Sequence, residues 1–178
     1  MIAIINEAHS TTLDNEKHIV SGWFDIPLSP LGEKQSLELG ERYSNDSFAA
    51  IFCSDLQRAY KTAELAFGNR FPIIQDERLR ECDYGDFTHR ESSFVEAEKI
   101  NRISIPFPNG ESYLQTNTRM KSFLDDLSKK YEGKRVMIIG HRATQYGLEY
   151  WINKVSLEKQ ITTPWKWQPG WTYQLNKI

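Results

Sequence analysis

Two short apolar runs constrain the fold of this chain more than any other feature. Residues 2–5 (IAII) and 136–139 (VMII) contain no polar side chain, and each run leads into a histidine, His9 and His141. Apolar runs of this length are typical of strands buried in an α/β sheet. Ligands bind beyond the carboxyl ends of such strands, so the two histidines are expected to face one pocket although 132 residues separate them. Either histidine alone would be interpreted as an ordinary loop residue. The prediction of a shared pocket depends on finding one at the end of each of the two strands.

Further segments fill out an α/β pattern. Strands are predicted for residues 48–53, an apolar run without polar alternation, for residues 72–75, and for the edge segment 165–175, which ends in the alternating WTYQL. Helices are predicted for residues 30–43, 56–67, 92–102, 113–131 and 143–152. Together these segments predict a three-layer α/β fold, with a mostly parallel central sheet and helices on both of its faces.

The composition is that of one globular domain. With 39% apolar and 26% charged residues and no linker-like stretch, residues 1–178 are expected to form a single domain. A net charge of −2 with evenly spread signs offers no basic face for nucleic acid, so a small substrate is expected. The two cysteines, Cys53 and Cys82, are expected to be free thiols, because they have neither metal-ligand spacing nor the density of a disulfide scaffold.

The apolar runs are too short for a membrane span, which needs about 18 residues, and no signal peptide is recognisable. A cytoplasmic location without membrane contact is therefore expected. The sequence predicts no particular oligomeric state.

Four polar side chains follow the predicted parallel strands at one edge of the sheet: His9, Arg58, Glu81 and His141. This set suits phosphoryl transfer through a histidine. An imidazole nitrogen of His9 can attack phosphorus, Arg58 and a protonated His141 can neutralise the phosphoryl oxygens, and Glu81 can give a proton to the departing alkoxide. The chemistry needs no metal or other cofactor, and no cluster of carboxylates, histidines or cysteines has metal-ligand spacing.

Purely structural roles are the alternatives. Glu81 could form a surface ion pair with Arg78 or Arg80, and Arg58 could pair with Asp55 in its own helix turn. The tryptophans are expected to pack in the core or at the sheet edge and are assigned no role in binding; they are Trp23, Trp165, Trp167 and Trp171.

Short motifs accompany these residues in a fixed order. They are Gly22-Trp23, Asp25-Ile26-Pro27-Leu28-Ser29, Gly32-Glu33, Ser54-Asp55-Leu56-Gln57-Arg58-Ala59, Thr62-Ala63-Glu64, Leu79-Arg80-Glu81, Tyr84-Gly85-Asp86, Pro108-Asn109-Gly110-Glu111-Ser112 and Gly140-His141. In this combination the chain resembles, over nearly its whole length, the histidine phosphatase superfamily, which includes the cofactor-dependent phosphoglycerate mutases. The resemblance implies a phosphoglycerate mutase-like fold. It also implies that His9 is the phospho-acceptor, that Glu81 is the proton donor, and that Arg58 and His141 bind phosphate.

The chain departs from the family pattern at the first motif. Where the family has Arg-His-Gly, this sequence has Ala8-His9-Ser10, so the first arginine is missing. Counting back from Gly22-Trp23 without a gap places His9 on the family histidine and Asn15 on the family asparagine. Counting forward from the apolar run instead places Asn6-Glu7 there, which would leave the protein catalytically dead. The first register is preferred because it keeps the histidine, the asparagine and the loop length together.

A missing bidentate arginine removes a charge-assisted contact worth about 1.5–3 kcal/mol, a roughly 10- to 150-fold loss if nothing replaces it. Arg142, Lys17 and His18 are the basic residues near enough in sequence to compensate. A solvated position at the start of a helix is the alternative for Arg142. Ser10 and Thr11 can add neutral donors.

The preferred function is a metal-independent phosphomonoesterase that acts on a small phosphorylated metabolite through a phosphohistidine on His9. A phosphomutase is an alternative, although 178 residues leave little room for the covering segment that protects a phosphoenzyme. A different alternative, suggested by Ala8, is a non-catalytic or weakly active phosphate-binding or regulatory module. Specificity is expected from residues 87–105, which carry no recognisable motif.

Overall fold

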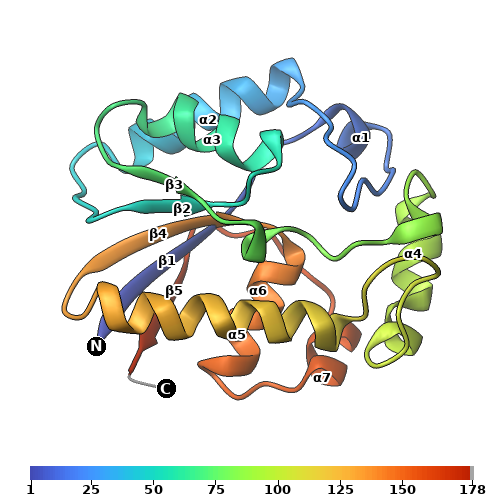
Figure 1. Ribbon diagram of the computed structural model, residues 1–178. Helices are drawn as coiled ribbons and strands as arrows, with labels where there is room; N and C mark the ends of the chain where they lie inside the picture. Colours follow the sequence, from blue (N-terminus) through green and yellow to red (C-terminus); the bar gives the residue numbers. More distant parts are fainter. Residues whose placement is uncertain (177–178) are drawn as a thin grey trace.

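The computed structural model describes residues 1–176, in which a five-stranded sheet lies between two layers of helices (Figure 1). The strands are β1 (Ile2–Ala8), β2 (Ile51–Cys53), β3 (Ile73–Gln75), β4 (Arg135–Gly140) and β5 (Trp171–Leu175), and their order in the sheet is β3-β2-β4-β1-β5. The first four strands are parallel, whereas β5 runs antiparallel along β1 at the sheet edge. The predicted α/β fold with a mostly parallel sheet is confirmed.

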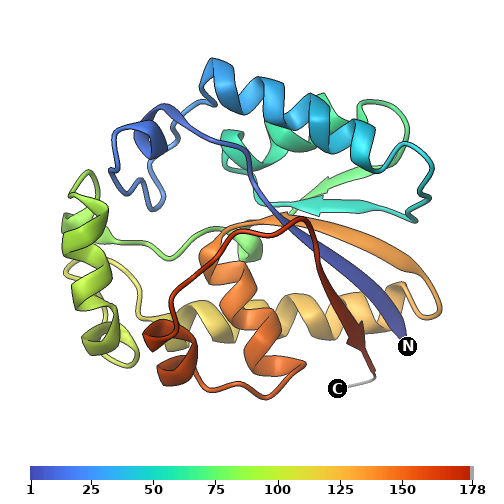
Figure 2. The ribbon, with the colours of Figure 1, turned by 180° about the vertical axis from the view of Figure 1, so that it is seen from behind.

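Helices cover both faces of the sheet. One face carries α2 (Pro30–Arg42) and α3 (Gln57–Phe67), and the other carries α5 (Tyr113–Lys130), α6 (Arg142–Trp151) and α7 (Leu157–Thr162) (Figures 1 and 2). Two short helices, α1 (Leu13–Glu16) and α4 (Ser92–Glu98), lie beyond the carboxyl ends of the strands. Between β3 and α5 the chain also forms three short 3-10 helices: η1 (Glu77–Leu79), η2 (Gly85–Phe87) and η3 (Lys99–Arg102).

The apolar run in β4 is continuous because both faces of this strand are covered. Val136 and Ile138 belong to the core against α5 and α6, whereas Met137 and Ile139 belong to the core against α2 and α3. Successive side chains of a strand point to opposite faces, so a central strand between two helical layers must be apolar at every position. β4 therefore holds the centre of the sheet, between β2 and β1.

The predicted helices 30–43, 56–67, 113–131 and 143–152 are each found within one residue of their predicted ends. The strand predicted at 48–53 is regular only in its last half, and the helix predicted at 92–102 divides into α4 and η3. The edge strand begins at Trp171 rather than at 165, because Pro169 lacks a donor for the ladder and Gly170 has a left-handed φ of 65°. Neither α1 nor α7 was predicted.

Candidate active site

His9 and His141 lie side by side at the carboxyl edge of the sheet. Ala8 and Gly140 face each other in the parallel pair of β1 and β4, and the amide of His9 donates to the carbonyl of Gly140 at 3.0 Å. The next residue on each strand is therefore a histidine, and the two ring centroids are 5.0 Å apart. The shared pocket predicted from the two apolar runs is present.

His9 has one free ring nitrogen. Its Nδ1 lies 2.8 Å from the carbonyl oxygen of Ser10. A carbonyl oxygen can only accept, so Nδ1 carries the proton and Nε2 keeps its lone pair. Burial lowers the pKa of His9 to about 3, with the charge of Arg58 as a second cause. The imidazole is therefore neutral near pH 7, as a nitrogen nucleophile must be.

His141 shares a hydrogen bond of 2.7 Å between its Nε2 and the hydroxyl of Ser54. Its Nδ1 is buried and has no hydrogen-bond partner among residues 1–176. Burial, followed by the charge of Arg58, lowers the pKa of His141 well below its ordinary value. The depth of the site thus disfavours a second cation beside Arg58, and the expected protonation of His141 stays a prediction about the site with phosphate bound.

Arg58 is buried in the first turn of α3, with 3% of its surface exposed. Two of its nitrogens donate to the carbonyls of Gly22 (2.7 Å) and Phe24 (3.1 Å). The alternative pairing with Asp55 is not found, because Asp55 accepts from Arg80 instead. Arg58 thus brings a positive charge close to both histidines, and its guanidinium, with five N–H donors, retains donors beyond those two carbonyl contacts.

Glu81 lies against the N-terminus of α6. Its carboxylate accepts from the amides of Cys82 (2.7 Å), Arg142 (3.1 Å) and Ala143 (3.3 Å). The last two residues begin α6, whose first amides have no partner within the helix. The alternative of an ion pair with Arg78 or Arg80 is not found, because Arg78 pairs with Asp76 and Asp126 and Arg80 pairs with Asp55.

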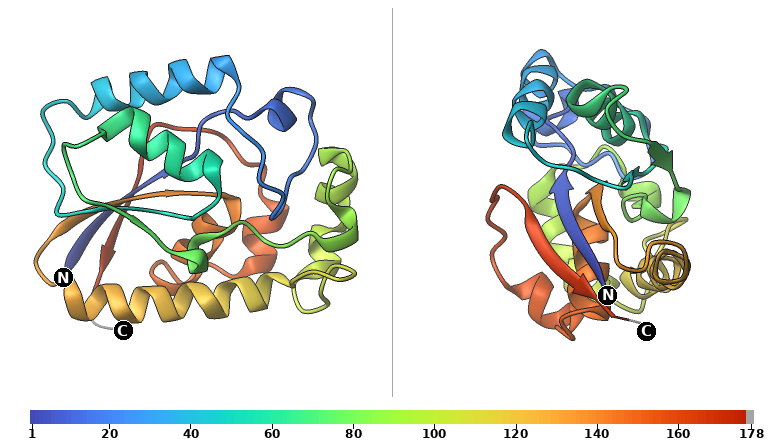
Figure 3. Two further views of the ribbon diagram at one scale, coloured as in Figure 1. Left: turned by 45° about the horizontal axis from the view of Figure 1, so that its top comes forward. Right: turned by 90° about the vertical axis from the view of Figure 1, so that its left-hand side faces the viewer.

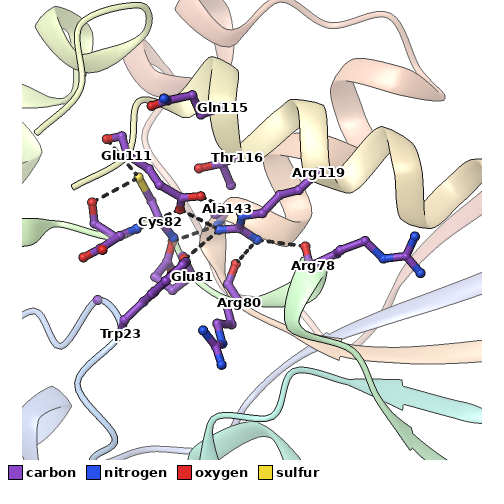
Figure 4. Close-up of polar contacts among 12 residues, drawn as sticks. Trp23, Arg78, Arg80, Glu81, Cys82, Glu111, Gln115, Thr116, Arg119 and Ala143 are labelled. Carbon is purple, nitrogen blue, oxygen red and sulfur yellow. Dashed lines mark hydrogen bonds and ion pairs between the residues drawn. The ribbon is translucent and has the colours of Figure 1, made fainter.

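Arg119 on α5 fixes the segment that carries Glu81 (Figure 4). Its guanidinium donates at 2.8 Å to each of the carbonyls of Arg78, Arg80 and Glu81. It also donates to both carboxylate oxygens of Glu111, at 3.0 and 2.9 Å, and Glu111 in turn accepts from the amide of Asp83. The sequence did not predict this role, because three of the partners are main-chain carbonyls, which leave no mark in a side-chain motif.

A cavity of about 660 Å³ opens over the histidines. Six of the predicted site residues line it: His9, Ser10, Asn15, Glu81, His141 and Arg142. Arg58 is not among the lining residues. Ala8 and Thr11, which the sequence also placed in the first motif and its loop, line it as well. Residues that the sequence did not predict complete the lining: Glu7, Gln35, Glu38, Leu39, Arg42, Trp165 and Trp167.

Ser10 and Asn15 are already partly engaged. The hydroxyl of Ser10 accepts from Ser36 at 2.9 Å, and its amide donates to the hydroxyl of Thr62 at 3.0 Å. The side-chain oxygen of Asn15 accepts from the amide of Thr12 at 3.0 Å and so caps α1. Each of these side chains keeps a further donor, the Ser10 hydroxyl or the Asn15 amide group, for a ligand in the cavity.

Arg142 is a basic side chain of the cavity in which the first arginine is missing. Its guanidinium carbon lies 4.4 Å from the ring centroid of Trp165, and it lines the same cavity as Ala8. Arg142 is also the first residue of α6 and is half-buried, so it combines a helix-start position with a place in the cavity wall. Lys17 and His18, the other compensating groups suggested by the sequence, are exposed and do not line the cavity.

The rival register would place Asn6-Glu7 in the catalytic loop. Both residues instead lie inside β1, opposite Ile138 and Ile139. The carboxylate of Glu7 is buried and accepts from the hydroxyl of Tyr43 at 2.7 Å and from Arg42 at 3.3 Å. This geometry favours the register that begins the loop at His9.

No group of three or more histidine, cysteine or acidic side chains in the described part of the chain is arranged to hold a metal ion. Over the same residues, no helix has the length and apolar character required to cross a bilayer.

The structure is that of an α/β protein with two histidines paired at the carboxyl edge of its sheet. The chain belongs to the histidine phosphatase superfamily (branch 1), whose family model matches residues 8–166. It is similar to "Putative phosphoserine phosphatase 2" of Hydrogenobacter thermophilus, with 30% identity over 160 residues that cover 84% of this chain and 78% of the relative. It is also similar to "Probable phosphoglycerate mutase GpmB" of Enterobacter, with 31% identity over 150 residues that cover 79% of this chain and 70% of the relative.

The fold is shared with solved structures. That of Bacillus stearothermophilus YhfR superimposes with a TM-score of 0.84 and 26% identity, covering 95% of this chain and 88% of the other. The phosphoglycerate mutase-like fold implied by the sequence motifs is confirmed.

Proposed function

We propose that this protein is a metal-independent phosphomonoesterase that hydrolyses small phosphorylated metabolites through a phosphohistidine on His9. The observation that carries the proposal is the state of His9. Its proton is held on Nδ1 by the Ser10 carbonyl, its pKa is far below neutrality, and its ring lies 5.0 Å from that of His141. Membership of the histidine phosphatase superfamily and a relative named as a phosphatase support the same activity.

The reaction divides into two displacements at phosphorus. Nε2 of His9 attacks the phosphorus, so a P–N bond forms while the bond to the ester oxygen breaks, and protonated Glu81 gives its proton to the departing alkoxide. A water molecule then attacks the phosphohistidine and gives a proton to Glu81. The P–N bond breaks, phosphate leaves, and His9 returns to its neutral form.

The phosphate oxygens meet a set of donors around the two rings. We assign phosphate binding to Arg58, His141, Arg142, Ser10 and Asn15. A phosphate dianion offsets the charge of Arg58, which is a cause of the low pKa of both histidines, and therefore raises the pKa of His141. In this proposal His141 acquires its proton together with the substrate and stabilises the transferred group as a cation.

Arg142 replaces part of what Ala8 lacks. A guanidinium stacked on an indole ring uses its face for that contact, and the N–H groups in its plane remain available for phosphate oxygens. Such a donor need not reproduce the bidentate geometry of an arginine at position 8. We therefore expect an active enzyme whose anion affinity is below the level that a full set of arginines would give.

The test is hydrolysis of para-nitrophenyl phosphate at mildly acidic pH in excess chelator. Wild type should turn over and should accumulate phosphate on His9 in rapid quench, whereas His9→Asn should show no turnover. His18→Asn is the matched control, because His18 is exposed and lies outside the cavity. Activity that disappears with chelator and returns with a divalent ion would contradict the proposal.

A phosphomutase is the second candidate, because the chain is also similar to a protein named as a phosphoglycerate mutase. Transfer of the phosphoryl group from His9 to an added alcohol, in preference to water, would identify it. Binding of phosphate without any turnover would instead identify the non-catalytic module suggested by Ala8.

A further inference from the structure

The cavity over the histidines has a second end that the phosphate chemistry does not use. It continues between α2 and the segment 163–170, which links α7 to β5 and crosses the molecule next to α2 (Figure 3). From α2 it is lined by Gln35, Glu38, Leu39 and Arg42, and from the segment by Trp165 and Trp167. The whole cavity of about 660 Å³ falls within the range of about 300–1,000 Å³ typical of sites that enclose an organic ligand.

Ala8 contributes little bulk to the wall of the cavity. It lines the cavity together with its neighbours Glu7 and His9, and its side chain is a single methyl group. An arginine at this position would occupy part of the space that the methyl group leaves open. The small side chain leaves a continuous path from His9 to the tryptophans, which a substrate bound at the histidine can follow.

The electrostatics of the second end disfavour another anion. Arg42 is balanced by the buried carboxylate of Glu7, at 3.3 Å, and Glu38 adds a carboxylate whose cationic partner, Lys34, is largely exposed. The guanidinium carbon of Arg42 lies 5.9 Å from the ring centroid of Trp167, whose residue surface is 57% exposed. The surface offered to a ligand is therefore an indole ring with polar groups at its border and no unbalanced positive charge.

We propose that this second end is a leaving-group subsite that takes an uncharged planar ring, aryl or heteroaryl, attached to the phosphorylated alcohol. The inference rests on the proposed function, since it assigns the part of the substrate that departs from His9. Stacking on Trp167 contributes to binding of a planar ring, because offset aromatic pairs gain about 0.5–1.5 kcal/mol beyond the burial of their area. The predicted preference is about 2- to 13-fold for an aromatic ring over a saturated ring of the same size.

The test compares kcat/KM for 2-phenylethyl phosphate and 2-cyclohexylethyl phosphate. Both are esters of primary alcohols of similar acidity, so the chemical step is matched and the planarity of the ring is the variable. Wild type should prefer the phenyl ester by the factor above, Trp167→Ala should reduce the ratio to near one, and Trp167→Phe should restore most of it. Phe94→Ala is the control, since Phe94 is an exposed ring on α4 that does not line the cavity.

Two results would overturn the subsite. One is a phenyl-to-cyclohexyl ratio of kcat/KM near one in wild type. The other is a preference for the phenyl ester that Phe94→Ala abolishes and Trp167→Ala preserves. The second result would support the earlier expectation that residues 87–105, which include Phe94, set the specificity. The two corresponding phosphonates, which cannot be hydrolysed, separate this inference from the proposed function. If no ester is turned over, the phosphomonoesterase assignment fails. The subsite is then still decided by the ratio of the affinities for the phenyl and cyclohexyl phosphonates, measured by calorimetry in wild type and in Trp167→Ala.

Discussion

The amide of His9 donates to the carbonyl of Gly140, the residue that immediately precedes His141. Strand register, and not a loop conformation, therefore sets the 5.0 Å spacing of the two rings. Gly140 is required for this register, because a Cβ there would lie 2.7 Å from the side chain of Thr144. The hydroxyl of Thr144 in turn accepts from the amide of His141. The backbone on either side of the Gly140–His141 bond is therefore held, by β1 through the Gly140 carbonyl and by Thr144 through the His141 amide.

The role of Glu81 predicts a dependence on the leaving group. Glu81→Gln removes the proton donor and keeps one side-chain oxygen, which can still accept from the amides of Cys82 and Ala143, whereas the amide of Arg142 loses its acceptor. Turnover of an alkyl phosphate should fall by about 10²- to 10⁴-fold, the usual contribution of a general acid, whereas para-nitrophenyl phosphate needs little protonation and should slow far less. Steady-state rates on the two esters provide the measurement, and equal slowing of both would remove Glu81 from the role of acid.

Ala8→Arg tests the missing arginine. The new guanidinium should strengthen binding of phosphate or vanadate, by less than the roughly 1.5–3 kcal/mol of a charge-assisted contact because the loop does not orient it. Arg142 lines the same cavity, so the two cations should repel each other and the gain should be larger in an Arg142→Ala background. Anion affinities of wild type, both single variants and the double variant complete the cycle. Unchanged affinity in all four proteins would mean that no phosphate site lies beside His9.

Arg119→Ala should loosen the segment that carries Glu81. The substitution removes the donors of Arg119 to the Glu111 carboxylate and to three carbonyls, at a cost of about 2–4 kcal/mol in the free energy of unfolding. Glu111 keeps the amide of Asp83, and the carbonyl of Glu81 keeps the indole N–H of Trp23. Lys121→Ala on the same helix removes a partly exposed pair with Asp125 and a contact with the ring of Trp151, and should cost about 1 kcal/mol.

The catalytic readout separates positioning from a general loss of stability. Arg119→Ala should slow alkyl phosphates more than para-nitrophenyl phosphate under conditions in which the variant is folded, and Arg119→Lys should recover part of the difference. A uniform loss on both esters would mean that Arg119 stabilises the fold without positioning Glu81.

The neutral histidines predict a loss of stability on mild acidification. His9 has a pKa of about 3 in the folded protein, whereas an unfolded histidine titrates near 6.5, so the unfolded chain takes up a proton first as the pH falls. Stability from this group is complete above about pH 6.5 and declines by about 1.4 kcal/mol per unit below it, down to the folded pKa. Urea unfolding measures the free energy of unfolding at pH 7 and at pH 5. The decrease in this free energy between the two pH values should be about 1–2 kcal/mol smaller in His9→Asn than in wild type. An identical decline in the two proteins would contradict the low pKa, and His18→Asn serves as the exposed control.

The sequence alone predicted the sheet and the paired histidines, because the carboxyl ends of parallel strands must share an edge. It could not predict the lowered pKa of His141, which depends on how deeply the imidazole is buried and on the charge of Arg58 beside it. It also missed Arg119, whose partners are main-chain carbonyls brought together by the loop after β3.

Trp165 and Trp167 were expected to pack in the core or at the sheet edge, since their pattern runs on into the alternating residues of β5. The structure separates them from the strand at Pro169 and Gly170: Trp165 donates to Gln145 on α6, and Trp167 lies near Arg42 on α2. The position at which β5 begins decides whether these tryptophans belong to the sheet edge or to the cavity wall. The ends of strands are the part of a structure that a sequence pattern predicts least well.

The same segment that carries the tryptophans continues directly into β5, the antiparallel strand at the edge of the sheet. The cavity wall and the edge strand are therefore continuous in the chain and meet at Gly170. The backbone of Gly170 lies against the hydroxyl of Tyr43 and the carboxylate of Glu7. An edge strand opens more readily than a central one, and anything that binds only the closed form raises the free energy of that opening. Occupancy of the cavity should consequently be visible at a distance from the histidines, as slower hydrogen exchange at the amides with which β5 pairs to β1.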